Sequence, residues 1–486
     1  MSRSTAASAT CTVAPAEEGL RRRIGIIGGG FTGAMFAVHL ARSARTPVDI
    51  DILEPRPTLG AGLAYGSCRP EHRINVPSDR LSVFAEEPLH FSDWLRRTGR
   101  WQADADALTA EGDHYSRRFD FGSYIAELVA ETAASNASVS TIRHVRAAAS
   151  GLERHDGAWR VDGDDGSAAT YDDVVLCATY GAPAFPWPLR EDAAAQPHLV
   201  RNPWDWPAIT AIPRDADVFV IGTGLTMCDA IVTLRQGGHR GSITAVSRRA
   251  LTPRPHGEFD TEYDLFAGAP PPATALGLLR QIRRHIRDLA AEGRQWHAVV
   301  DSLRRSLFRY WASLPIGERA TIVRRLRAYW DVHRFRIAPQ VAQLMADGQR
   351  EGWLAVRAGR IAAIGVEDGR FAVRWTPKGE AARTGRFGAI INCTGPDADL
   401  ARSANPLLSA AIRDGHVRPD ALRLGLDVDA LGHVLGRDGT PTPGLWAAGP
   451  LARAVVGEAT GVPEASAHAR LVARALTETA NERSEP

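Results

Sequence analysis

The sequence predicts an α/β protein made of two Rossmann-like units with a helical insertion. Two glycine-rich turns support this fold class, because each stands between a short apolar strand and a helix of periodic apolar residues. The turns begin at Gly28 and Gly222, and they differ too much to be a tandem repeat. A third observation is the length of 486 residues, which is too great for a single hydrophobic core.

The first unit is predicted from residue 24. An apolar strand over 24–27 leads into a G-x-G-x-x-G turn, whose glycines are Gly28, Gly30 and Gly33. Such glycines permit a tight turn and let backbone N–H groups approach a pyrophosphate at a helix N-terminus. The next strand closes on Glu54, which is placed to accept hydrogen bonds from an adenosine ribose. An adenine dinucleotide site is therefore expected here.

The second turn fits the same pattern less completely. Gly222 and Gly224 are present, but the third glycine position holds Met227, where glycine normally allows close packing of helix on strand. The turn alone is compatible with a nucleotide site or with a purely structural Rossmann turn.

The strand after the second turn ends on two arginines instead of an acidic residue. Arg248 and Arg249 stand where an adenosine 2′-phosphate would meet a guanidinium group, which favours NADPH over NADH. The alternative is a solvated basic strand end, since arginine is abundant in this chain.

Other segments are predicted from apolar periodicity and turn residues. A helix is expected over 121–132, strands over 144–149, 159–161 and 174–178, and these strands fit a small antiparallel meander laid against the first unit. Helices are expected from 273 to about 345. Four short strands and a final helix follow, at 354–357, 360–366, 371–375, 389–392 and after 463.

This order predicts a discontinuous first domain interrupted by the second. A disordered leader is expected over 1–20. The first domain would comprise 21–210 and 385–480, and the second would comprise 211–384, with the helical insertion at about 273–345.

Composition excludes several classes of function. The 58 Lys+Arg and 56 Asp+Glu give a net charge of +2, which offers no electrostatic reason to expect nucleic acid or a membrane surface as partner. No stretch reaches the ~20 apolar residues of a membrane span, and the leader has no apolar core of a secretion signal. Five scattered cysteines and the lack of metal-ligand spacing argue against disulfide, zinc or other metal sites. A cytoplasmic location is expected.

Several motifs together resemble a known family. IGIIGGGFTGAMFAVHLARS, LGAGLAYG, HRINVPSDRLS, VIGTGLTMCDA, SRRALTPRPH, WDVHRFRIAP, INCTGP and GLWAAGPL are similar to motifs of the bacterial FAD-NAD(P)-binding flavoproteins, and they run from about residue 21 to 476. That family is related to flavin-dependent N-hydroxylating and Baeyer–Villiger-type monooxygenases. The resemblance implies a glutathione-reductase-like arrangement, with FAD in the discontinuous domain and NADPH in the middle one.

The resemblance also implies which residues hold the cofactors. The FAD residues would be Gly28, Gly30, Phe31, Thr32, Gly33, Glu54, Asn75, Val76, Gly449 and Val462. The NADPH residues would be Gly222, Gly224, Thr226, Arg248 and Arg249. One departure stands out, because Pro450 follows Gly449 where many such flavoproteins carry an aspartate for the ribityl chain. Flavin binding there would rely on backbone and on the helix that begins after 461–463.

The implied activity is an FAD-dependent, NADPH-using monooxygenase that hydroxylates the nitrogen of a small amine or amino acid. Two alternatives remain: an NAD(P)H:acceptor oxidoreductase without oxygen insertion, and a non-catalytic flavin-binding protein. The lack of C-x-x-C disfavours electron relay to a protein dithiol. Catalytic residues are not assigned, but His256, His333 and Arg334 are candidates, and His72 lies in another family-like motif. The insertion is expected to close over the flavin.

Overall fold

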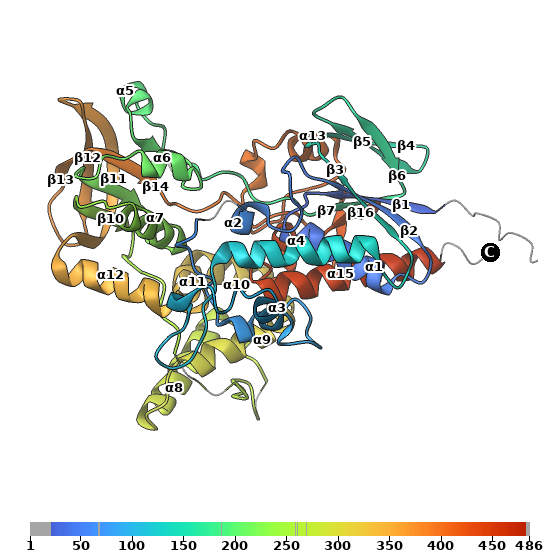
Figure 1. The fold of residues 1–486 in the computed structure, drawn as a ribbon, viewed down its shortest axis with the longest axis horizontal. Helices are drawn as coiled ribbons and strands as arrows, with labels where there is room; N and C mark the ends of the chain where they lie inside the picture. The colour runs from blue at the N-terminus through green and yellow to red at the C-terminus, as the bar shows by residue number, and fades with distance from the viewer. Residues whose placement is uncertain are drawn as a thin grey trace, which may run out of the picture.

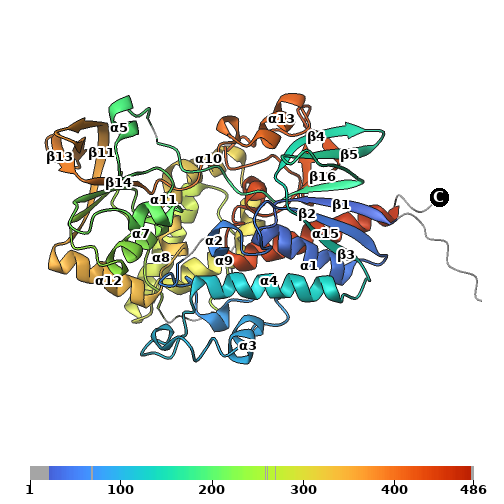
Figure 2. The ribbon, with the colours of Figure 1, turned by 45° about the horizontal axis from the view of Figure 1, so that its top comes forward.

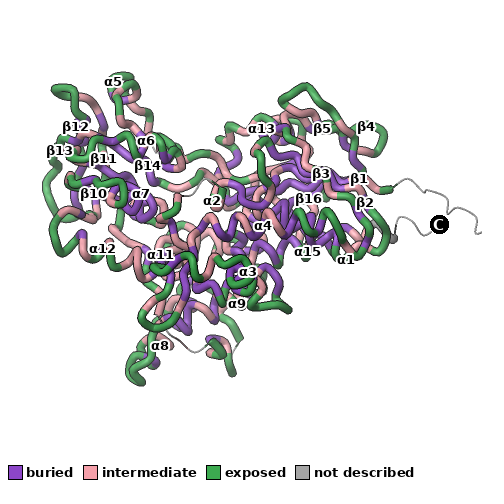
Figure 3. The backbone as a smooth tube through the Cα atoms, in the orientation of Figure 1, coloured by how far each residue is buried: buried purple, intermediate pink, exposed green. Residues whose placement is uncertain are grey.

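The computed structural model describes residues 21–66, 69–185, 187–257, 259, 261–268 and 270–482. The predicted leader, 1–20, lies outside the described residues. The described chain forms two lobes, each built around its own largely parallel sheet (Figure 1). Buried residues concentrate in the strands of both sheets and in the helices against them (Figure 3).

The first sheet has six strands in the order β15-β16-β7-β1-β2-β3. Their bounds are β1 (Arg22–Ile27), β2 (Val48–Leu53), β3 (Thr141–Val145), β7 (Asp173–Leu176), β15 (His433–Leu435) and β16 (Pro441–Ala447). Pairing is parallel except at the β15 edge, and Ile24 of β1 lies between Ile50 and Asp173 of its neighbours. The central strands are buried on both faces, as the continuous Ile and Val runs of parallel strands require.

Helices cover one face of this sheet: α1 (Phe31–Ser43), α4 (Arg118–Ala134) and α15 (Val462–Glu482). Helix α1 packs between the other two, and Phe36, Phe121 and Val472 belong to one buried cluster. Because α15 and β16 come from the end of the chain, the first unit is completed only after the second has been traversed.

An antiparallel meander lies on the opposite face, as the turn residues predicted. It consists of β4 (Ala149–His155), β5 (Ala158–Gly163) and β6 (Ala168–Tyr171), all antiparallel. Of the three strands expected for it, however, only 159–161 falls inside it. The segment 174–178 overlaps β7 of the parallel sheet, and 144–149 spans the end of β3 and the start of β4. Trp159 and Tyr171 pack with Leu407 of α13 (Pro406–Asp414) in a second buried cluster.

The second sheet has seven strands in the order β13-β12-β11-β10-β9-β14-β8. Their bounds are β8 (Leu199–Val200), β9 (Val218–Ile221), β10 (Ile243–Ser247), β11 (Leu354–Glu367), β12 (Arg370–Pro377), β13 (Arg383–Phe387) and β14 (Ala389–Asn392). Beside this sheet lie α5 (Glu191–Ala195), α6 (Trp206–Thr210), α7 (Leu225–Gln236) and α12 (Pro339–Glu351).

Strand pairing extends the second unit beyond the expected division. The expected boundaries at 211 and 384 assign β8 and β14 to the first domain, but both strands pair within the second sheet. Strand β8 has only two residues, so it leaves no alternating pattern in the sequence. Strand β14 was predicted as a strand. The sheet to which it belongs could not be predicted, because its neighbours β8 and β9 are remote in the sequence.

The helical insertion comprises α8 (Ala275–Ala291), α9 (His297–Ser313), α10 (Ile316–Thr321), a π-helical turn (Ile322–Leu326) and α11 (Arg327–Arg334). These helices have their own small core, and in Figure 1 α8 and α9 lie below the lobes with α10 and α11 between them. Figure 2 shows the same helices from a second side. Helix α12, which the prediction counted with the insertion, instead packs on α7 and β11 of the second unit.

Shorter helices complete the described chain. They are α2 (Gly62–Gly66), α3 (His90–Arg97), α14 (Arg453–Val456) and four 3-10 turns at Ser78–Arg80, Ala105–Ala107, Leu400–Arg402 and Gly449–Ala452. The indole of Trp311 in α9 donates to the Ala454 carbonyl of α14 at 2.7 Å, which ties the insertion to the first unit. No helix of the described ranges is long and apolar enough to cross a membrane.

Buried polar contacts join the two units directly. Arg118 of α4 forms a bidentate ion pair with Asp229 of α7, with N–O distances of 2.6 and 2.9 Å. Beside it, His72 shares a 2.9 Å hydrogen bond with the hydroxyl of Thr233. His72 is thus an interface residue, and burial lowers the pKa of its imidazole.

Candidate active site

A cleft of about 950 Å³ lies between the two units and the insertion. Its walls come from the loop that follows α2, the second glycine turn, the chain after β10, helix α11 and the start of α15. Carboxyl ends of strands from both sheets meet here, which is where open α/β sheets bind ligands.

The first glycine turn lies at the carboxyl end of β1. Gly28 has φ +99°, and a Cβ there would stand 3.0 Å from the Cys177 carbonyl oxygen. A Cβ on Gly33 would stand only 1.9 Å from the Gly28 carbonyl oxygen, so the close packing of α1 requires glycine. At Gly30, in contrast, the nearest atom to a Cβ is Cα of Gly62 at 3.5 Å. Protein packing does not require glycine at this middle position, whereas close approach of a pyrophosphate would.

Glu54 organises this turn from the end of β2. Its carboxylate is 4% exposed and accepts from the backbone N–H of Gly29 and of Arg56, each at 3.0 Å. Oε1 also accepts from the Arg56 guanidinium at 3.3 Å, whereas Oε2 keeps a lone pair for a further donor. The geometry therefore fits a ribose hydroxyl at Glu54.

The remaining predicted FAD residues fall in two groups. Asn75, Val76 and Val462 line the cleft. Gly449 lies against the first turn of α1, since a Cβ there would stand 2.5 Å from the Thr32 hydroxyl oxygen. Phe31 is half-buried, with its ring 5.9 Å from that of Phe121.

The second glycine turn opens directly into the cleft. Gly222 has φ +109°, and a Cβ there would stand 2.2 Å from the Cys393 carbonyl oxygen. Gly224 begins α7 with no side-chain cap, and a Cβ there would meet nothing within 4 Å. Met227, at the third position, is fully buried in the core of the second unit. The free N–H groups of α7 and the open middle glycine fit a second phosphate-bearing ligand.

Arg248 and Arg249 line the same part of the cleft, as does Thr226. Neither arginine forms an ion pair with a carboxylate of the described residues. The guanidinium of Arg249 lies 5.7 Å from the ring centre of Tyr329, which positions it without neutralising it. Both arginines therefore remain available to an anion beside the second glycine turn.

His256 links the two units at the edge of the cleft. Its Nε2–H donates to the carbonyl of Asn75, because a carbonyl oxygen can only accept. Burial, assisted by the charge of Arg336, lowers the pKa of His256 to about 3, so the ring is neutral at pH 7. Its Nδ1 is buried without a partner among the described residues. That atom is the free acceptor of a neutral imidazole.

Arg334 and His333 occupy different surroundings from those expected. Arg334 lines the cleft, but its guanidinium pairs with Glu464 at 3.0 Å, and Arg304 pairs with the same carboxylate at 3.0 Å. His333 does not line the cleft; its Nδ1 bonds to the Tyr329 carbonyl at 2.7 Å. Sequence reasoning could not foresee the Glu464 partner, which lies 130 positions away.

The charge of the cleft lining is predominantly positive. Nine arginines line it: Arg80, Arg118, Arg248, Arg249, Arg304, Arg327, Arg334, Arg336 and Arg453. The acidic residues in the lining are Asp229, Asp301 and Asp331, and each pairs with an arginine. This field favours anionic ligands, such as nucleotide phosphates and carboxylates.

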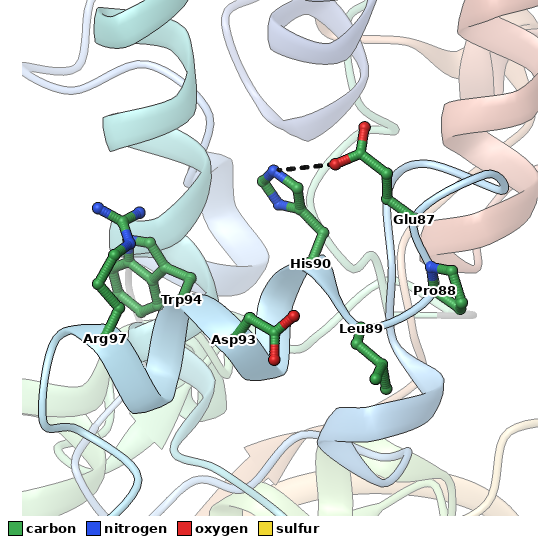
Figure 4. Close-up of a pocket in the computed structure, with 7 residues that line it drawn as sticks. All are labelled: Glu87, Pro88, Leu89, His90, Asp93, Trp94 and Arg97. Carbon is green, nitrogen blue, oxygen red and sulfur yellow. Dashed lines mark ion pairs between the residues drawn. The ribbon is translucent and has the colours of Figure 1, made fainter.

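A second hollow, of about 520 Å³, lies on helix α3 (Figure 4). Glu87 and His90 face each other across it, with Oε2 3.8 Å from Nε2. Burial lowers the pKa of His90. None of the predicted site residues lines this hollow. Across the described ranges, no cluster of three or more His, Cys, Asp or Glu side chains could hold a metal ion.

Residues 25–181 match the family model described as FAD-NAD(P)-binding. No curated protein matches the chain. Among solved structures, L-lysine 6-monooxygenase from Pseudomonas syringae is 18% identical, with a TM-score of 0.63 over 96% of this chain and 100% of that one. An ornithine N-hydroxylase from Kutzneria sp. 744, solved with reduced FAD, NADP⁺ and L-ornithine, is 14% identical, with a TM-score of 0.59 over 95% and 99%.

A thioredoxin reductase from T. acidophilum is also similar, at 12% identity and a TM-score of 0.50 over 95% of this chain and 100% of that one. These comparisons confirm the predicted fold class, in which two Rossmann-like units are joined as in two-dinucleotide flavoproteins. The family-model match confirms the predicted likeness of the first unit to FAD-NAD(P)-binding proteins.

Proposed function

We propose that the protein is an FAD- and NADPH-dependent monooxygenase that hydroxylates the nitrogen of a small amine or amino acid. The observation that carries the proposal is the pair of glycine turns. In each, protein packing leaves room for a Cβ at the middle glycine, while the first glycine is required by nearby backbone. Two pyrophosphate-bearing ligands on either side of one cleft explain both middle glycines.

FAD is assigned to the first unit. Gly28, Gly30, Gly33 and Glu54 would hold its ADP half, and Asn75, Val76 and Val462 its ring end. The N-terminus of α15 borders the cleft, and its free N–H groups favour negative charge nearby. Gly449 supports the start of α1 through its contact with Thr32.

NADPH is assigned to the second unit. Gly222, Gly224 and Thr226 would receive its pyrophosphate at the start of α7. Arg248 and Arg249 would receive the 2′-phosphate, because both line this end of the cleft without a carboxylate partner among the described residues.

The reaction consumes an amine, molecular oxygen, NADPH and a proton, and it yields a hydroxylamine, NADP⁺ and water. FAD supplies the redox chemistry, passing two electrons from the nicotinamide to oxygen. The chain supplies a cleft with residues of the insertion in its wall. On that side the insertion would have to exclude water from the reacting groups. Neutral His256 holds the Asn75 loop through its Nε2–H.

The three described cysteines argue against a disulfide reductase. Cys177, Cys228 and Cys393 are buried, and burial raises the pKa of each thiol. A buried, protonated thiol is a poor nucleophile for dithiol exchange. Unpaired cysteines also fit the reducing cytoplasm.

The test is a product measurement. Purified protein loaded with FAD is given NADPH and oxygen with L-lysine, L-ornithine, cadaverine or putrescine, and hydroxylamine product is measured against NADPH consumed. The proposal expects product from at least one amine, with coupling above the level without amine. Rapid reduction of a quinone with no hydroxylamine from any amine would favour the acceptor oxidoreductase, and bound FAD without turnover would favour a binding protein.

A further inference from the structure

Arg336 is a buried cation without a counter-ion among the described residues. Its side chain is 5% exposed, yet it forms no ion pair within the described part of the chain. Its one hydrogen bond to a described residue runs from Nε to the backbone carbonyl of His333, at 3.1 Å. Burial lowers the pKa of this guanidinium to about 10, which leaves it charged at neutral pH. An unpaired buried charge is costly, so a stable protein is expected to give it an anionic partner.

The surroundings hold this side chain in place. Its guanidinium lies 5.2 Å from the ring centre of Phe259 and 5.4 Å from that of Trp296. The backbone on either side is also fixed, because Ile337 N–H donates to the Arg254 carbonyl at 3.0 Å. Arg336 is therefore a preorganised donor in the wall of the cleft, and little entropy is lost when it binds an anion.

No carboxylate of the described residues pairs with this guanidinium. Asp301 is the acidic residue that most raises the pKa of Arg336, but it pairs with Arg304 at 3.2 Å and with Arg305 at 2.8 Å. The 2′-phosphate of NADPH is assigned to Arg248 and Arg249, beside the other glycine turn. Arg336 is instead close to His256, whose hydrogen bond to Asn75 connects it to the flavin loop.

We propose that Arg336 binds the carboxylate of the substrate, so that the enzyme acts on an amino acid and discriminates against the diamine of the same chain length. This assignment rests on the proposed function for the identity of the substrate as an amine. Guanidinium and carboxylate pair through two parallel hydrogen bonds, which fixes the orientation of the distal amine. Each acidic residue described in the cleft lining already pairs with an arginine, so a second ammonium group would have to compete with that arginine for it.

The test compares pairs that differ only by the carboxylate: L-lysine with cadaverine, and L-ornithine with putrescine. Affinity is measured by calorimetry on protein with oxidised FAD and no NADPH, so the result does not depend on turnover. At least one amino acid should bind about ten- to a hundredfold more tightly than its diamine. Arg336→Met should abolish this preference, and Arg336→Lys should restore part of it.

The control variant is Arg284→Met, which removes an exposed arginine of α8 and should leave both affinities unchanged. Arg336→Met should also keep or raise the Tm of the ligand-free protein, because it replaces an unpaired buried charge with an apolar chain of similar length. Equal or tighter diamine binding, no binding by either amino acid, or an unchanged preference in Arg336→Met would each overturn the assignment. If the amino acid binds more tightly than its diamine but no hydroxylamine forms, the proposed function is wrong and the assignment of Arg336 to the carboxylate remains.

Discussion

Replacing Gly30 with alanine should weaken FAD binding while leaving the fold intact. Gly30 has φ −68° and ψ −168°, which alanine adopts without strain, and the nearest atom to the new Cβ is 3.5 Å away. Gly30 forms no side-chain capping hydrogen bond to α1, so the alanine substitution removes no such bond. The free energy of unfolding of the apoprotein should therefore change by less than about 1 kcal/mol.

The expected loss of FAD affinity is larger than this change in stability. A methyl group at position 30 occupies the space through which backbone N–H groups approach the pyrophosphate. Losing one or two charge-assisted hydrogen bonds of about 1.5–3 kcal/mol each weakens binding at least about tenfold.

Gly33→Ala is the matched comparison. Its Cβ would stand 1.9 Å from the Gly28 carbonyl oxygen, so α1 must shift and the apoprotein should lose about 1–3 kcal/mol of stability. Gly224→Ala is the second comparison, because its Cβ meets nothing within 4 Å. That variant should bind FAD normally and bind NADPH more weakly.

The assay is titration of each apoprotein with FAD, followed by flavin fluorescence, together with the Tm of each apoprotein. NADPH affinity is measured on the FAD-loaded forms. Unchanged FAD affinity in Gly30→Ala would refute the assignment of the first turn. A drop in apoprotein Tm as large as that of Gly33→Ala would refute the view that protein packing leaves this position free.

Further predictions concern specificity, pH and the contact between the units. Arg248→Ala and Arg249→Ala should each lower the NADPH/NADH ratio of kcat/KM about tenfold or more, and an unchanged ratio in both would exclude 2′-phosphate binding there. Three buried histidines have pKa values of about 4: His39, His297 and His468. Below about pH 6.5 these histidines take up protons in the unfolded chain but not in the folded one. The free energy of unfolding should therefore be highest above about pH 6.5. Between about pH 6.5 and about pH 4 it should fall by up to about 1.4 kcal/mol per pH unit for each histidine. Urea unfolding at pH 7, 6 and 5 measures this slope, and equal stability at all three would contradict it. Arg118→Met should cost about 3–5 kcal/mol by leaving Asp229 uncompensated, and the double variant with Asp229→Leu should recover much of the lost Tm.

Local patterns in the sequence predicted the parts of the fold that depend on local physics. Gly28 and Gly222 were recognised because a strand, a left-handed turn and a helix follow one another within a few residues. The meander was predicted from turn residues, but only its central strand was placed correctly: the expected strand at 174–178 is β7 of the parallel sheet, and β6 was not expected. The expected start of the second unit was less accurate, since Leu199–Val200 is too short to show a period.

The wall of the cleft depends on contacts that are remote in the sequence. Arg334 was expected to be available to a substrate, but Glu464 neutralises it from the first turn of α15. Arg336, two positions later, was not singled out, because one arginine among many carries no signal until the structure shows that it is buried and has no described counter-ion. His256 was recognised by its motif alone, and its bond to Asn75 required the folded arrangement of both units.

The most direct test of the proposed monooxygenase is rapid mixing of the NADPH-reduced protein with oxygenated buffer. Flavin absorbance is followed with and without L-lysine or L-ornithine, and a parallel sample receives a quinone instead of oxygen. A monooxygenase should return to the oxidised form in two kinetic phases, through a species whose spectrum differs from both end states, with hydroxylamine formed when an amino acid is present. Reoxidation by oxygen in one phase under every condition, with rapid electron transfer to the quinone and no hydroxylamine, would contradict it.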